Sequence, residues 1–149
     1  MQIPVFVSRP SQLDERQIEV FAWLEERLES LSLQPRTLGS SDFAVETPLR
    51  EVLVLARHCA GGIILGFDRV GDRGSTPWNQ LEAGILYGID LPLLLFADPL
   101  VPQRDGGIFA VGSSDLYVGP MPYDDAQQAQ ARETLLAWQG RVRQHYYSV

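Results

Sequence analysis

Short apolar runs alternate with longer amphipathic stretches along the chain. Residues 61–67 (GGIILGF) and 91–96 (LPLLLF) are almost continuously apolar, which is typical of strands covered on both faces. The run at 3–8 (IPVFVS) predicts a first buried strand. Weaker runs at 36–38 and 116–118 predict two further strands, the first of them at an edge of the sheet.

The intervening stretches predict helices. The leucine and valine stripe within 14–31 is amphipathic, and the threonine–proline pairs at 47–48 and 76–77 are typical helix starts. The last helix begins at Asp124 or Asp125. We therefore expect helices over the ranges 14–31, 47–59, 77–89 and 125–145; the apolar face of the last one comprises Ala129, Leu135, Leu136, Trp138 and Val142.

Alternation of strands and helices predicts an α/β fold in one domain spanning residues 1–149. The expected architecture is a three-layer, flavodoxin-like fold with a five-stranded parallel sheet in the order 2-1-3-4-5. Ligands of such folds bind beyond the carboxyl ends of the strands. The loops at 8–11, 39–46 and 67–75 and the start of the helix at 77–89 lie at that edge. Trp78 and Glu82, four residues apart, share a face there.

Charge and composition exclude several classes of function. The net charge is −7 and the 12 basic side chains are all arginine, which argues against nucleic acid or an anionic membrane as partner. Without lysine there is no Schiff-base or P-loop chemistry. The single cysteine, Cys59, and the distant His58 and His145 predict no metal site. No apolar run is long enough for a membrane helix and no leader motif is recognisable, so we expect a cytoplasmic protein.

Glu82 is the leading candidate for chemistry, because a carboxylate close to a ribose stabilises the positive charge that builds up when an N-glycosidic bond breaks. The alternative is a solvated helix carboxylate. Trp78 either stacks on a ring or packs in the core. Ser8 and Arg9 follow the first strand, where Arg9 either grips a phosphate or is an ordinary surface residue.

Two aromatic residues lie in candidate loops. Phe43, beside Asp42, belongs either to a loop over the pocket or to a simple turn. Phe67 ends the third strand, where it either stacks on a base or closes the core. The glycines at 71 and 74 do not form a dinucleotide fingerprint.

Residues 3–118 resemble the TIR domain superfamily in element order, in particular stand-alone bacterial TIR-like proteins of antiphage defence. The run Val5-Phe6-Val7-Ser8 resembles the first conserved box, and residues 36–43 occupy the place of the second. Residues 75–82 (STPWNQLE) are similar to the S-x-x-W-x-x-x-E segment whose glutamate is catalytic in NAD-consuming TIR enzymes.

This resemblance implies an NAD nucleosidase or ADP-ribose cyclase. Glu82 would be catalytic, and NAD would be the substrate, with no cofactor. It also implies a TIR-like defence signalling role and self-association or another defence protein as partner. The substrate-binding residues would be Ser8, Arg9, Asp42, Phe43, Phe67, Ser75, Trp78 and Asn79.

The chain departs from the TIR pattern in two places. Asn79 stands where a cysteine often follows the tryptophan, and the R-D-x-x-P-G pattern of the second box is missing. The segment Glu82-Ala83-Gly84 also resembles nucleoside 2-deoxyribosyltransferases, in which a glutamate is the nucleophile. Three hypotheses therefore remain: an NAD-consuming enzyme, a deoxyribosyltransferase-like enzyme, and a non-enzymatic module for nucleotide sensing or assembly.

Overall fold

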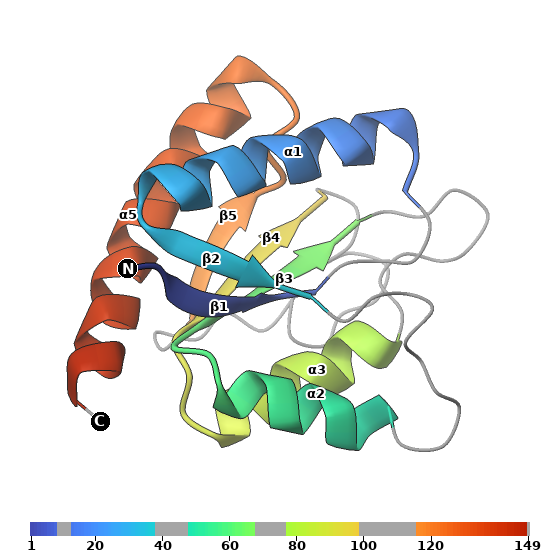
Figure 1. The fold of residues 1–149 in the computed structure, drawn as a ribbon. Helices are drawn as coiled ribbons and strands as arrows, with labels where there is room; N and C mark the ends of the chain where they lie inside the picture. The colour runs from blue at the N-terminus through green and yellow to red at the C-terminus, as the bar shows by residue number, and fades with distance from the viewer. Residues whose placement is uncertain (9–12, 38–47, 68–76, 99–115, 149) are drawn as a thin grey trace.

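The computed structural model describes residues 1–8, 13–37, 48–67, 77–98 and 116–148, which form parallel strands and the helices that cover them (Figure 1). Its elements are β1 (Ile3–Val7), α1 (Glu15–Ser30), β2 (Leu33–Arg36), α2 (Pro48–Arg57), β3 (Gly62–Gly66), α3 (Pro77–Gly88), β4 (Leu93–Ala97), β5 (Tyr117–Pro120) and α5 (Asp125–Ser148).

The strands form one five-stranded sheet in the order β2-β1-β3-β4-β5, and every neighbouring pair is parallel. This is the predicted flavodoxin-like α/β fold. Strands β3 and β4 lie inside the sheet and are buried along their whole length, as their continuous apolar runs indicate.

Helices cover both faces of the sheet (Figure 1). Helices α1 and α5 pack on one face, together with strand residues such as Val5, Val7 and Phe96. Helices α2 and α3 pack on the other face, with Phe6 and Leu95. Neighbouring strand residues thus point to opposite faces, and both faces are apolar because both are covered.

Local signals determine where the first and last helices begin. The Asp14 carboxylate accepts a hydrogen bond from the backbone N–H of Gln17, and the Gln17 side chain accepts one from the Asp14 backbone N–H. This reciprocal pair caps α1. Asp124 likewise accepts from the Gln127 N–H at the start of α5. The proposed caps at Thr47 and Thr76 lie outside the described residues.

Two strand predictions need correction. The second strand is Leu33–Arg36 and shares only Arg36 with the predicted range 36–38. Leu33 is fully buried, and Pro35 is tolerated because β2 is an edge strand. The last strand runs from Tyr117 to Pro120, beyond the predicted end at 118, and it is also at an edge.

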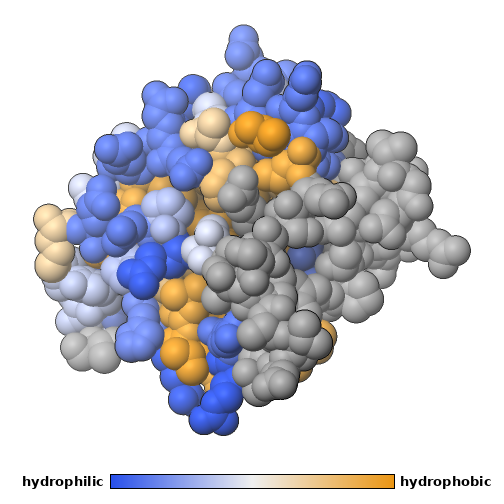
Figure 2. Space-filling view, turned by 45° about the vertical axis from the view of Figure 1, so that its right-hand side comes forward, coloured by the Kyte–Doolittle hydropathy of each residue, from blue (hydrophilic) through white to orange (hydrophobic). Residues whose placement is uncertain are grey.

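On the face shown in Figure 2, polar side chains cover much of the described surface, with apolar side chains between them. Exposed charged side chains include the glutamates of α1 and, in α5, Arg132, Glu133 and Arg141. None of the helices in the described part of the chain combines the length and the apolar character needed to cross a bilayer.

Candidate active site

The carboxylate of Glu82 lies inside the protein near the carboxyl ends of the strands. Its side chain belongs to α3 and is only 4% exposed. Its Oε1 accepts a hydrogen bond of 3.0 Å from the hydroxyl of Ser8. The alternative of a solvated helix carboxylate is therefore wrong, because the residue is buried and hydrogen-bonded.

Ser8 is placed by the sheet. It directly follows β1, and its backbone N–H donates to the carbonyl of Ile63 in β3 at 2.9 Å. Because side chains alternate along a strand, Ser8 points to the same face as Phe6, which is the face covered by α2 and α3. The hydroxyl thus meets a carboxylate that is 74 positions away in sequence.

The helix that carries Glu82 is attached to the sheet on both sides of this residue. Asn79, one turn earlier, is 6% exposed, and its side-chain amide donates to the Leu65 carbonyl at 3.2 Å. Ala83 and Leu86, which follow Glu82, are fully buried against the sheet. Asn79 therefore holds the start of α3 against the end of β3.

Phe67 does not join this group. It is 2% exposed and packs with the core on the α1 and α5 face, opposite to the face of Ser8. The structure thus favours the core interpretation of Phe67 over a ring that stacks on a base.

The structure does not describe the side chains of the remaining residues predicted to bind substrate. Arg9, Asp42, Phe43 and Ser75 lie outside the described residues. Trp78 belongs to the first turn of α3, but its side chain is also outside the described part. Their proposed roles stay predictions.

The sequence interpretation missed a second buried carboxylate at the same edge of the sheet. Asp98 follows β4 and is 6% exposed, and its Oδ2 accepts a 3.0 Å hydrogen bond from the Tyr123 hydroxyl. The Arg16 guanidinium lies 3.5 Å from the centre of the Tyr123 ring. An acidic residue two positions after the apolar run at 91–96 was the available signal.

Burial and the Asp98 contact change the acidity of this tyrosine. Desolvation raises the pKa of Tyr123, and the hydrogen bond to Asp98 and the charge of that carboxylate raise it further; Arg16 opposes them. Tyr123 therefore stays protonated and acts as a donor to Asp98. Since Phe96 and Tyr123 belong to the α1 and α5 face, this pair lies across the sheet from Glu82.

Cys59 is buried beyond the end of α2, as expected for a small core residue. Desolvation raises the pKa of its thiol to about 11, with Arg36 opposing the shift. Such a thiol is a poor nucleophile near neutral pH. Within the described residues no three His, Cys, Asp or Glu side chains are grouped so that they could hold a metal ion.

The chain matches no protein-family model, and no curated protein is significantly similar to it in sequence. The functional argument therefore depends on the site itself. That site consists of a buried carboxylate, a serine that orients it, and an asparagine that fixes the helix carrying it.

Proposed function

We propose that this protein is a TIR-like enzyme that cleaves the nicotinamide–ribose bond of NAD, with Glu82 as its catalytic carboxylate. The observation that supports this best is the burial of Glu82 together with its hydrogen bond from Ser8. The position near the carboxyl ends of a parallel sheet agrees with where such folds bind ligands. The TIR resemblance of residues 75–82 suggests the substrate and a role in antiphage signalling.

The proposed reaction needs a negative charge beside the sugar. As the C1′–N bond breaks, its electron pair leaves with nicotinamide and the ribose becomes a cation. A carboxylate shielded from water stabilises this cation more strongly than an exposed one does. Water then attacks C1′ and loses a proton, which yields ADP-ribose; attack by a nitrogen of the adenine yields the cyclic product instead.

The contacts of Ser8 and Asn79 favour a revised role for both. Ser8 donates to Glu82 and Asn79 donates to the Leu65 carbonyl. In this proposal they are positioning residues, which keep the carboxylate at a fixed place and orientation. The residues proposed to contact the substrate are then Arg9, Asp42, Phe43, Ser75 and Trp78.

The test is to incubate the purified protein with NAD over a wide range of protein concentrations, since the TIR resemblance implies self-association. Products are followed by mass spectrometry. We expect NAD loss with ADP-ribose or its cyclic form as product. Glu82→Gln keeps the size of the side chain and removes its charge, so turnover should fall by at least about a hundredfold.

Glu133→Gln is the matched control, because Glu133 is an exposed glutamate of α5 and its loss changes the net charge equally. It should retain full activity. Circular dichroism establishes that both variants are folded. A Glu82→Gln variant that is folded and as active as the parent contradicts the role of Glu82. The absence of NAD loss at every protein concentration contradicts the enzyme proposal.

A nucleoside 2-deoxyribosyltransferase-like activity is the second candidate. The same buried carboxylate is suited to attack C1′ of a deoxynucleoside, and the segment at 82–84 supports this alternative. The same mass spectrometric assay, with a deoxynucleoside and a free base, decides between the two. Base exchange and a deoxyribosyl adduct on Glu82 would favour the transferase over the NAD-consuming enzyme.

A further inference from the structure

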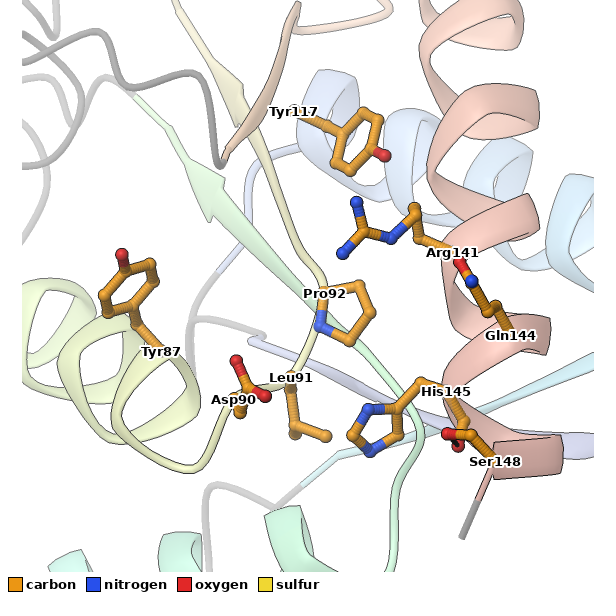
Figure 3. A pocket seen from close by; sticks show the side chains of 9 residues that line it. All are labelled: Tyr87, Asp90, Leu91, Pro92, Tyr117, Arg141, Gln144, His145 and Ser148. Carbon is orange, nitrogen blue, oxygen red and sulfur yellow. Dashed lines mark hydrogen bonds between the residues drawn. The ribbon is translucent and has the colours of Figure 1, made fainter.

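A cavity of about 730 Å³ opens at the amino-terminal ends of the strands, opposite to Glu82, where β4 and β5 begin (Figure 3). Its floor includes Leu91 and Pro92, and its walls are the end of α3 and the last turns of α5. Of the residues predicted to bind substrate, the three whose side chains the structure describes, Ser8, Phe67 and Asn79, do not line it. Its volume lies in the range of small-molecule sites.

The α3 wall carries negative potential. Helix α3 ends at Gly88, and the chain reverses at Asp90, whose φ is 67°. This turn is closed by bonds from the Asp90 and Leu91 N–H groups to the carbonyls of Tyr87 and Leu86. Figure 3 shows Tyr87 and Asp90 on this side of the cavity. A carboxylate, an aromatic ring and a helix carboxyl end together favour a cationic group.

The α5 wall carries the opposite charge. Arg141 and His145 are four residues apart and line the cavity from the same side of α5. Figure 3 shows the Arg141 guanidinium reaching toward Pro92 and Tyr117. Arg141 makes no ion pair with Asp90 or with any other residue of the described ranges. The cavity thus presents separate donors for an anionic group.

We propose that this cavity binds a small zwitterion with a primary amine and a carboxylate, namely an amino acid or short peptide. The amine lies at Asp90 and Tyr87, and the carboxylate lies at Arg141 and His145. A ligand of this kind matches both walls at once. A polyphosphate matches only one wall, because its other charges would approach Asp90 and the carboxyl end of α3. The proposal is independent of the reaction at Glu82.

The test uses the full-length protein and backbone amide NMR. The probes are the standard amino acids and a panel of tripeptides Xaa-Ala-Ala, each titrated to about 10 mM, which detects binding in the millimolar range. We expect saturable shifts at Asp90, Leu91 and Gln144 with at least one probe. Acetylation of the probe's amine and amidation of its carboxylate should each weaken binding about tenfold or more.

Two protein variants should have the same effect as these blocked probes. Asp90→Asn removes the charge and keeps a residue that tolerates a positive φ, and Arg141→Gln removes the facing charge. Each should weaken binding about tenfold. The matched controls are Asp125→Asn and Arg57→Gln, which remove exposed charges outside the cavity and should leave binding unchanged.

Three results would overturn the proposal. The first is that no probe of the panel causes saturable shifts at the cavity. The second is that the acetylated and amidated probes bind as tightly as the unmodified ones. The third is that the control variants weaken binding as much as Asp90→Asn and Arg141→Gln do. Saturable shifts with tripeptides and not with amino acids identify a peptide as the ligand. Loss of NAD turnover in Glu82→Gln has no bearing on any of these results.

Discussion

Gly61 lies directly against the ring of Trp138, so that a methyl group on Gly61 would come within 3.0 Å of Cζ2 of Trp138 and within 2.6 Å of Cγ2 of Val142. Trp138 is fully buried in α5, and its Nε1–H donates to the Pro92 carbonyl at 2.9 Å. The absence of a side chain at Gly61 therefore sets the distance between α5 and the sheet.

We expect Gly61→Ala to lower the free energy of unfolding by about 1–3 kcal/mol, because both neighbours are held in the core and cannot give way cheaply. The measurement is urea denaturation followed by circular dichroism. Gly140→Ala is the matched control, since a methyl group there meets no atom within 4 Å. Within helix α5 this control should raise stability by up to about 1 kcal/mol. Equal effects of the two substitutions would contradict the packing argument.

The bond between Ser8 and Glu82 predicts the effect of Ser8→Ala. Removing the hydroxyl leaves a buried carboxylate oxygen with one partner fewer, so stability should fall by about 1–3 kcal/mol. Because the bond orients Glu82, kcat for NAD should fall with little change in KM. Ser30→Ala is the control: its hydroxyl bonds the Arg27 carbonyl at the exposed end of α1, and its loss should cost less than about 0.5 kcal/mol. A raised KM with unchanged kcat in Ser8→Ala would mean that Ser8 contacts substrate instead.

Cys59 predicts a loss of stability at alkaline pH. Its thiol has an ordinary pKa of 9.0 and a folded-state pKa of about 11. Below pH 9 both states are protonated; between pH 9 and 11 the unfolded state loses its proton first, so stability falls as pH rises. The loss is on the order of 3 kcal/mol at most, because each pKa unit of difference between the two states corresponds to about 1.4 kcal/mol. Urea denaturation at several pH values measures it, and Cys59→Ala should have a smaller decline between pH 9 and 11 than the parent. Parallel declines would show that other groups cause it.

The hydrophobic pattern was sufficient for the architecture. Continuous apolar runs at 61–67 and 91–96 correctly predicted β3 and β4, two of the three inner strands, and alternation with helices predicted that the strands are parallel. The edge strands β2 and β5 were less well predicted. Each has only one buried residue, so its sequence carries no continuous apolar run. Leu33 is the buried residue of β2, and the sequence around it carries no apolar run.

The apolar pattern of the last helix predicted its buried face only in part. In α5, Leu135, Trp138 and Val142 are buried as predicted. Leu136 is 57% exposed and Ala129 is exposed, while Ala131 is buried in the core. Apolar residues that are neighbours in sequence cannot all face one side of a helix, and an alanine is equally acceptable on either side.

The site was partly within reach of the sequence. Topology predicted that Glu82 lies near the carboxyl ends of the strands, and the structure shows it buried there with a hydrogen bond from Ser8. Their direct bond, between residues on β1 and α3, was not predictable because it depends on how closely the helix packs on the sheet. The same holds for Asn79 and the Leu65 carbonyl. The cavity at the other edge joins residues of three elements that share no motif.

Helix α3 reaches from one edge of the sheet to the other, with Glu82 in its first half and Tyr87 in its last turn. Its 12 residues form a stiff rod about 18 Å long. A rod of this kind cannot tilt at one end without displacing the other. Two occupants, one at each end, would influence each other only if one of them tilts this rod, and by thermodynamic reciprocity each would then change the affinity of the other by the same factor.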